Sequence, residues 1–219
     1  MNLTEYKQKL ERLKGQKQRL MHSITATKQA IRQSKQRALD AEEAQRIIQH
    51  VAQQTQEQLQ FHVSELVSMA LAAVFDDPYT FKLQFTTRRG KTEADIYFER
   101  DGRQYSDPTF AAGMGACDVA AFGLRVSLWS LKRPRTNNVL ILDEPFRDLK
   151  GMDESEKGKP KELRKSYAYK AGELVSMVSK KLGLQFLIAS HSPDVIEAAD
   201  RVFEVALVNG VSQVERIRN

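Results

Sequence analysis

Apolar residues recur at alternating three- and four-residue intervals through the first part of the chain. Two heptad sets, which begin at Leu3 and Tyr6, run without a break to residue 62, and twelve of their eighteen positions are apolar. Gly15 is the one glycine in this range, and the first proline of the chain is Pro78. This pattern predicts a coiled-coil helix, which would extend about 90 Å at roughly 1.5 Å per residue.

A helix of this length cannot bury its heptad face alone, so we expect a partner helix, either antiparallel or parallel. Since no second heptad run of similar length follows, that helix would lie on another chain. The alternative is a surface helix that docks on the chain's own globular domain. We therefore expect two parts: a coiled-coil arm over residues 1–62 and a globular domain over residues 63–219.

From residue 63 the periodicity of the chain changes. The helix continues and should stop at residues 76–78, Asp-Asp-Pro, because the residue before a proline disfavours helix. Residues 81–89 and 93–100 alternate apolar and polar side chains, which predicts the two strands of a hairpin. Residues 101–102, Asp-Gly, are a turn signal that follows them.

The rest of the chain alternates between helical patterns and apolar runs. Two of these runs are apolar on both faces, which is typical of strands buried in a parallel sheet. Strand–helix–strand alternation predicts an α/β domain. The expected elements are helix 117–132, strand 137–144, helix 162–183, strand 184–191, helix 192–200 and a closing strand pair over 201–217 around Asn209-Gly210.

The basic charge is concentrated at the N-terminal end. Residues 1–60 hold eleven Lys and Arg and six Asp and Glu, a net charge of +5, whereas the whole chain carries +6. Lys and Arg residues that neutralise DNA phosphates release counterions, so the arm is a candidate for tracking along a duplex. It is equally a candidate for the solvated face of a coiled coil.

Composition excludes several classes of protein. The single cysteine, Cys117, excludes an internal disulfide and a Cys-rich metal site. The N-terminus lacks the apolar core of a signal peptide, and no run of about 18 apolar residues indicates a membrane span. We expect a soluble, cytoplasmic protein without a membrane partner.

The first buried strand ends in two acidic residues, Asp143 and Glu144. The carboxyl edge of an open parallel sheet is where α/β proteins bind ligands. A Mg²⁺ ion beside phosphates accepts one such carboxylate and keeps several waters, and the adjacent carboxylate can polarise an attacking water. The alternative is a strand end whose acids face solvent or cap the next helix.

Two further features favour a nucleotide site. His191 follows the second buried strand, and pairing of the two strands would bring it beside Glu144, where it can hydrogen-bond a γ-phosphate or the attacking water. Upstream, Gly113-Met114-Gly115 precedes a helix and presents free amides and a helix dipole to an anion. Taken alone, such a histidine is more often structural, and the glycines could serve a tight turn only.

In this order the three motifs resemble the C-terminal half of an ABC-type ATPase head of the SbcC/SMC class, a family of DNA-repair and chromosome-maintenance ATPases. The resemblance implies an α/β fold: an ABC-ATPase C-terminal lobe, with a mainly parallel sheet, helices and a small β-hairpin, preceded by a long coiled-coil helix. It implies ATP and Mg²⁺ as cofactors. Asp143 would hold Mg²⁺ through water, Glu144 would be the general base, and His191 would contact the γ-phosphate.

The resemblance also implies a second half of the site. Gly113, Met114 and Gly115 would be the signature loop, which in that family reaches across a dimer to the ATP of a second head. The D-loop would consist of Arg147, Asp148 and Leu149.

Three positions depart from the usual motifs of that family. Ala112 stands where a serine usually precedes the glycines, Met114 lies between them, and Lys150 follows Leu149 where an aspartate is usual. These departures motivate an alternative, a catalytically degenerate head that serves as an assembly or DNA-binding module. A third hypothesis is an ordinary α/β domain with a dimerisation arm and no nucleotide.

A phosphate-binding loop is the part of such a site that this sequence lacks. Residues 90–92, Gly-Lys-Thr, match the end of the pattern G-x-x-x-x-G-K-[ST], but Phe85 stands at its first glycine. They lie between two alternating strands, so we interpret them as a hairpin turn. The basic cluster Arg88, Arg89 and Lys91 remains a candidate contact to DNA phosphates.

We therefore hypothesise a half-subunit of an ATP-hydrolysing complex for DNA repair, recombination or replication. It would be an ATPase only as a composite, because a separate chain would supply the P-loop and an antiparallel coiled coil. A second head would complete the ATP-bound dimer. DNA is an expected partner, and a nuclease subunit is a further candidate.

Overall fold

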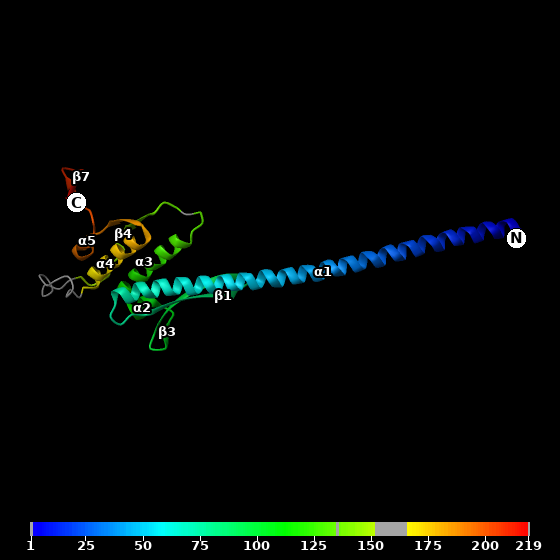
Figure 1. Ribbon diagram of the computed structural model, residues 1–219, viewed down its shortest axis with the longest axis horizontal. Helices are drawn as coiled ribbons and strands as arrows, with labels where there is room; N and C mark the ends of the chain where they lie inside the picture. The colour runs from blue at the N-terminus through cyan, green and yellow to red at the C-terminus, as the bar shows by residue number, and fades with distance from the viewer. Residues whose placement is uncertain (1, 135, 152–165, 219) are drawn as a thin grey trace. The chain divides into compact units, whose positions relative to one another are not determined.

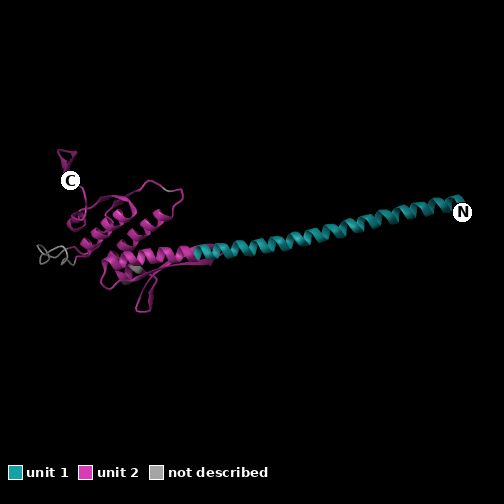
Figure 2. Ribbon diagram, in the orientation of Figure 1, with its two compact units in different colours: residues 1–56 teal, residues 57–219 magenta. Residues whose placement is uncertain are grey.

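The computed structural model of the protein describes residues 2–134, 136–151 and 166–218. The chain forms two compact units, Met1–Gln56 and Glu57–Asn219 (Figure 2). No helix within the described part of the chain is both long enough and apolar enough to cross a membrane.

A single helix, α1 (Leu3–Val74), spans 72 residues, as the uninterrupted heptad pattern predicts (Figure 1). In the first unit its side chains are exposed as far as Thr55, and the heptad residues Leu13, Leu20 and Ile31 have 53%, 63% and 49% of their surface accessible. The long N-terminal helix is confirmed, and its partner helix stays a prediction.

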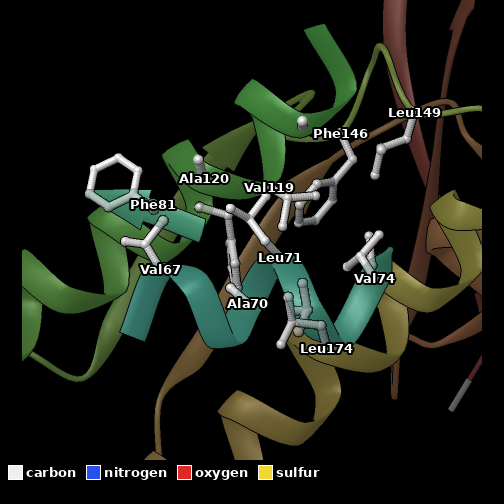
Figure 3. Close-up of a cluster of buried hydrophobic side chains, with 14 of the residues drawn as sticks. Val67, Ala70, Leu71, Val74, Phe81, Val119, Ala120, Phe146, Leu149 and Leu174 are labelled. Carbon is white, nitrogen blue, oxygen red and sulfur yellow. The ribbon is translucent and has the colours of Figure 1, made fainter. Parts of the chain in front are cut away.

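The C-terminal part of α1 is amphipathic and contributes to the core of the second unit. Val63, Val67, Ala70, Leu71 and Val74 recur at helical spacing and are all buried. The helix ends just before the Asp-Asp-Pro sequence, as predicted. Figure 3 shows later parts of the chain that share this core, among them Phe81, Val119, Ala120, Phe146, Leu149 and Leu174.

Three strands form an antiparallel sheet: β1 (Thr80–Arg88), β2 (Lys91–Arg100) and β3 (Arg103–Tyr105). The two-residue turns Arg89-Gly90 and Asp101-Gly102 join them, and all four turn residues have positive φ. Such turns are of type I′, whose twist matches that of the strands they connect. The predicted hairpin is confirmed, and the Gly-Lys-Thr sequence begins in its turn rather than in a strand-to-helix loop.

Polar side chains of α1 cover the outer edge of β1. The three side chains lie four residues apart on the helix, and the three N–H groups they accept from lie two residues apart on the strand, so one helix face follows one strand edge. The bonds run from Phe85 N–H to Gln60 Oε1 at 3.3 Å, from Leu83 N–H to Ser64 Oγ at 3.0 Å and from Phe81 N–H to Ser68 Oγ at 2.9 Å.

Two helices follow the sheet. The five-residue helix α2 (Pro108–Ala112) was not expected from the sequence, and the Asp107 carboxylate caps it by accepting from Phe110 N–H. Gly113, at a φ of 80°, separates it from α3 (Met114–Leu131). The predicted helix over 117–132 is confirmed, but it begins three residues earlier because Gly113 rather than Gly115 makes the turn.

The α/β part contains two parallel strands, β4 (Val139–Asp143) and β5 (Gln185–Ala189). Helix α4 (Tyr167–Leu182) precedes β5 and ends at Gly183, which adopts the left-handed conformation that commonly terminates helices. The first residues of the helix predicted from residue 162 lie outside the described part of the chain. A short helix, α5 (Pro193–Glu197), follows β5.

An antiparallel hairpin, β6 (Val202–Val208) and β7 (Val211–Arg218), closes the chain around a type I′ turn at Asn209-Gly210, as predicted. The guanidinium of Arg218 ties it to the end of α5. It donates to the carbonyl oxygens of Ile196, Glu197 and Ala199 at 3.2, 2.9 and 3.3 Å.

The predicted α/β class is confirmed, and parallel pairing among the described strands is confined to β4 and β5. The prediction that both strands are buried on both faces is wrong. Ile141 and Leu187 are 74% and 58% exposed. The core packs only against the opposite face, where Leu142 is buried and Phe186 lies 5.5 Å from the Phe122 ring of α3, centroid to centroid.

Candidate nucleotide-hydrolysing site

The acidic pair lies where β4 ends. Asp143 pairs with Ala189, and the N–H of Glu144 donates to the Ala189 carbonyl oxygen at 2.9 Å, which extends the parallel ladder by one bond. Glu144 has a φ of 42°, in the left-handed region that residues other than glycine seldom adopt. Strained positions of this kind gather at functional sites, and here the backbone turns sharply at the residue that carries the carboxylate.

Groups that follow β5 hold the Glu144 carboxylate. Its Oε1 lies 2.7 Å from His191 Nδ1 and also accepts from the His191 backbone N–H at 3.1 Å, while its Oε2 accepts from the Ser190 hydroxyl at 3.3 Å. These bonds, that of the His191 ring foremost, lower the pKa of Glu144 and favour its charged form. The predicted juxtaposition of His191 and Glu144 is confirmed.

Asp143 is exposed at the same strand end, on the face of β4 opposite to that of Leu142. Within the described residues, no three or more His, Cys, Asp and Glu side chains gather closely enough to hold a metal ion. A lone carboxylate fits Mg²⁺ in a nucleotide site, because that ion takes one or two carboxylates together with waters and phosphate oxygens. The donor set does not resemble a closed, all-protein metal cage.

The Gly113-Met114-Gly115 segment opens α3. A Cβ at Gly113 would meet nothing within 4 Å, and Met114 is 50% exposed, so this end of the segment faces solvent. At Gly115 a Cβ would lie 2.9 Å from Leu149 Cδ2 and 3.0 Å from the Asp148 carbonyl oxygen. Glycine is required there because the segment packs directly on residues 148–149.

The predicted D-loop is fastened to α3 by a hydrogen bond as well. The Asp148 N–H donates to Asp118 Oδ2 at 3.0 Å, and burial raises the pKa of Asp118. Leu149 is buried in the core, whereas Arg147 is exposed with its Nε 3.9 Å from Asp148 Oδ1. Sequence reasoning missed Asp118, whose one signal was an acid within an apolar helical pattern.

A buried contact joins Ser166, which precedes α4, to the segment that carries the histidine. The Ser166 hydroxyl donates to Asp194 Oδ2 at 2.8 Å, and both residues are buried. A Cβ at Gly151 would come within 3.3 Å of the same oxygen. Asp194 lies three residues after His191, so α5 is positioned by this contact. Sequence reasoning missed it because the two partners lie 28 residues apart along the chain.

The basic cluster at the hairpin tip is partly neutralised within the chain. Arg88 forms ion pairs with Glu93 at 3.2 Å and Asp95 at 2.7 Å, and the hydrogen bonds to these carboxylates raise its pKa. Arg89 and Lys91 are exposed at the turn. Of the three candidate DNA contacts, Arg88 therefore already has acidic partners.

No protein-family model matches the sequence, and no curated protein matches it. Solved structures match the chain in fold. A structure from work on ATP-driven dimerization and DNA-stimulated activation of SMC ATPases matches with a TM-score of 0.51 and 15% identity, over 77% of this chain and 88% of its own. An Smc head bound to the C-winged helix domain of ScpA matches with a TM-score of 0.52 and 15% identity, over 78% of this chain and 45% of its own.

A third structure, derived from Pyrococcus furiosus, is an Smc head domain with an extended coiled coil bound to the C-terminal domain of ScpA. It matches with a TM-score of 0.51 and 16% identity, over 72% of this chain and 35% of its own. The chain thus spans less than half the length of the two ScpA-bound heads. At these identities the likeness is one of fold. Over about three quarters of its length the chain shares the fold of SMC ATPase heads, which is the family that the sequence motifs indicated.

Proposed function

We propose that this chain is a half-subunit of an ATP-hydrolysing complex that acts on DNA in repair, recombination or replication. It supplies the signature loop, the acidic pair and the switch histidine, and a separate chain supplies the P-loop and an antiparallel coiled coil. The observation that carries the proposal is the 2.7 Å contact between Glu144 and His191 at the ends of two paired parallel strands. The fold shared with SMC ATPase heads supports it.

The acidic pair and the histidine have the chemistry that hydrolysis needs. The Glu144 side chain is charged and 29% exposed, so it can accept a proton from a water molecule at the strand end. The His191 side chain, 78% exposed beside it, would contact the terminal phosphate. Asp143 would hold Mg²⁺ through a water molecule, and this ion supplies charge neutralisation at the phosphates when bound.

The signature loop is proposed to serve a second head. The start of α3, an 18-residue helix, directs free N–H groups and the positive end of its dipole outward at Gly113 and Met114, which are exposed. Because Gly115 packs on Asp148 and Leu149, the signature loop and the D-loop would approach the second head's ATP as one body.

Duplex DNA is the proposed ligand of the arm. Residues 1–37 hold ten basic and two acidic residues, and α1 exposes all that the structure describes of them. Arg89 and Lys91 at the hairpin tip are further candidate contacts, and a nuclease subunit is a candidate partner. Contacts of this kind weaken steeply as the salt concentration rises.

Co-production with a P-loop chain tests the hydrolytic assignment. The partner to use is a protein from the same genome that carries G-x-x-x-x-G-K-[ST] near its start and a trailing heptad run. We expect Mg²⁺-dependent ATP hydrolysis by the pair, and we expect Glu144→Gln to slow turnover by about 10²-fold or more. The same variant should accumulate an ATP-bound dimer that size-exclusion chromatography detects.

Glu173→Gln is the matched control, because Glu173 is an exposed acid on α4, away from the strand ends. It should hydrolyse ATP at the wild-type rate. Normal turnover by Glu144→Gln would show that Glu144 is not the general base.

The second candidate function is a catalytically degenerate head that serves as an assembly or DNA-binding module. The residues Ala112, Met114 and Lys150, which depart from the usual motifs, favour it. It predicts a complex that forms with the P-loop chain and hydrolyses no ATP. Mg²⁺-dependent turnover that Asp143→Asn abolishes would rule this candidate out.

A further inference from the structure

His191 lies in a segment that has little packing of its own. Its side chain is 78% exposed, and the residues that follow it form α5, a helix of only five residues. Isolated helices of fewer than about 12 residues are marginal in water, so contacts with the rest of the chain must hold α5. The position of His191 beside Glu144 therefore depends on what fixes this short helix.

Helix α5 lies beside α4 (Figure 1), and the two helices approach closely at Gly172. A Cβ on Gly172 would lie 3.0 Å from Ala198 Cβ and 3.2 Å from the Val195 carbonyl oxygen. Val195 is buried, and the Arg218 guanidinium donates to carbonyl oxygens at the C-terminal end of α5. These contacts fix the middle and the C-terminal end of α5, but not the end that continues from His191.

The end of α5 nearer to His191 is held by Asp194, which lies in the first turn of the helix. Its Oδ2 accepts from the Ser166 hydroxyl at 2.8 Å, and the two residues are only 8% and 6% exposed. A hydrogen bond that is shielded from water is stronger than an exposed one, and breaking it costs the desolvation energy of a buried polar group. Asp194 therefore fixes the chain three residues after His191.

Ser166 is the N-cap of α4, and the first turn of that helix packs on the end of α1. The ring centroids of Tyr167 and Phe75 lie 5.0 Å apart, and Lys170 Nζ lies 2.7 Å from Asp76 Oδ1. Both helices contribute buried residues to the core of the second unit. The hydroxyl that holds α5 is therefore anchored to the core rather than to an exposed segment.

We propose that Asp194 is the positioning residue of His191, and that its hydrogen bond with Ser166 fixes the histidine ring against Glu144. This inference rests on the proposed function, in which His191 contacts the terminal phosphate. The buried contact lets the histidine keep one position while its ring stays exposed to a nucleotide. Such placement matters because an error of about 1 Å at a reacting group can cost about 10²-fold in rate.

Ser166 also caps α4, so its two roles have to be separated. Its hydroxyl oxygen accepts from Tyr169 N–H at 3.3 Å. Asparagine and aspartate cap helices about equally well, but only asparagine carries an N–H that can donate to Asp194. Ser166→Asn and Ser166→Asp are therefore a matched pair. Both can cap α4, whereas the aspartate removes the donor and places a second carboxylate beside the first.

Amide hydrogen exchange in the full chain, followed by NMR, distinguishes the two roles. The His191 N–H donates to Glu144 Oε1 at 3.1 Å and reports on the histidine segment, while the Tyr169 N–H reports on the cap. In Ser166→Asp we expect exchange to be about tenfold faster at His191 and nearly unchanged at Tyr169. In Ser166→Asn both amides should exchange nearly as in the wild type. Asp194→Ala should accelerate exchange at His191 as Ser166→Asp does.

Ser127→Ala is the control, because the Ser127 hydroxyl is fully buried but donates within α3, to the Gly123 carbonyl oxygen at 2.8 Å. It lies near the end of α3 at which Trp129 Nε1 donates to the carbonyl oxygen of Asn137, ahead of β4. This is the opposite end of β4 from the acidic pair. Exchange at His191 should therefore be the same in Ser127→Ala as in the wild type.

Three results would overturn the inference. The first is unchanged exchange at His191 in both Ser166→Asp and Asp194→Ala. The second is release of His191 in Ser166→Asn as fully as in Ser166→Asp, because the hydrogen-bond donor would then not matter. The third is equal acceleration at His191 and at the core amide of Val119, because the contact would then support the whole core rather than the histidine.

ATP turnover by the complex with the P-loop chain gives a second readout. Ser166→Asp should lower kcat by about tenfold or more and change the KM for ATP by about twofold at most, because a misplaced histidine weakens the transition state more than nucleotide binding. Ser166→Asn and Ser127→Ala should turn over at nearly the wild-type rate. A wild-type kcat in Ser166→Asp would overturn the inference. Absence of turnover by the wild-type complex would count against the proposed function alone, and hydrogen exchange, which needs no nucleotide, would still decide the role of Asp194.

Discussion

The sheet β1–β2–β3 and the parallel pair β4–β5 differ in how much of each the rest of the chain covers. Phe81 and Phe98 of the antiparallel sheet are almost fully buried, and its free edge on β1 is covered by the side chains of Gln60, Ser64 and Ser68 from α1. In the parallel pair one face is buried, and the other exposes Ile141. Among the described residues, the β1 edge of the first sheet is covered by α1 side chains, whereas one face of the second pair stays exposed.

The difference has a physical basis in how strand edges and faces behave. An unpaired strand edge invites pairing with other chains, and proteins prevent this by covering it. Here alternate N–H groups of β1 are occupied by helix side chains, so that edge offers few free donors. The exposed apolar residues Phe203, Val205 and Leu207 of β6 resemble the β4–β5 face rather than this sheet. Regions that the described chain covers and regions that it leaves exposed can thus be distinguished residue by residue.

The largest test substitutes one side chain on each side of the β4–β5 pair in the free chain: Phe122 of α3, which packs on the buried face, and Ile141, which lies on the exposed face. Phe122→Ala should lower the free energy of unfolding by about 3–5 kcal/mol, because it leaves a cavity among aromatic rings. Phe122 is 1% exposed and lies 5.4 and 5.5 Å from the rings of Phe146 and Phe186. Ile141→Ala should change it by about 0.5 kcal/mol or less, as exposed positions usually do.

Urea denaturation followed by the fluorescence of Trp129, the single tryptophan, measures both values. If Ile141→Ala cost as much as Phe122→Ala, the β4–β5 face would be covered within the chain. The contrast between the two regions would then disappear.

A smaller effect on stability is expected when one hydrogen bond that covers the edge of β1 is removed. Ser68→Ala removes the oxygen that accepts from Phe81 N–H at 2.9 Å, and an unsatisfied, partly buried N–H costs about 1–3 kcal/mol. Hydrogen exchange should accelerate at Phe81, and the free energy of unfolding should fall. Ser23→Ala, in an exposed part of the same helix, should change neither quantity. Unchanged exchange at Phe81 in the Ser68 variant would mean that the helix does not hold this edge.

Local signals in the sequence predicted most of the secondary structure. Asn209-Gly210 and Asp101-Gly102 specify type I′ turns through their own backbone preferences, and Gly183 ends α4 in the same way. The five-residue helix α2 was not predicted, because it makes little more than one helical turn of about 3.6 residues and so shows no recurring pattern. The exposure of Ile141 could not be predicted, because an apolar strand does not say which of its faces the rest of the chain will cover.

The residues of the candidate site likewise fall into those that the sequence predicted and those that it missed. Asp143, Glu144 and His191 were predicted to lie together because each follows the end of a strand, and the ends of paired parallel strands meet at one edge. Asp118 and Asp194 were missed because their contacts join segments far apart in the sequence. The sequence can predict that residues at the ends of paired strands lie together. It cannot predict which residues meet when segments far apart in the chain pack against each other.

The smallest effect is expected at the exposed end of the β4–β5 pair, where Glu144 meets His191. The folded chain lowers the pKa of Glu144, chiefly through the hydrogen bond from the His191 ring. A depressed folded-state pKa means that the contact stabilises the fold above the unfolded pKa, about 4.3 for glutamate, and that this contribution is lost as the pH falls through the folded value. Glu144→Gln removes the titrating group, so the stability difference between wild type and variant should shrink as the solution is acidified below that pH.

Unfolding midpoints across the acid range measure this difference, and the carboxyl ¹³C shift of Glu144 gives its titration directly. Glu173→Gln, on the exposed face of α4, is the control for the loss of one negative charge. His191→Ala should return the Glu144 titration toward the ordinary range, because it removes the first cause of the shift. A Glu144 titration that the loss of the histidine ring leaves unmoved would mean that the 2.7 Å contact does not persist in solution. The end of β4 would then still carry Glu144, but this chain alone would not fix the position of its carboxylate.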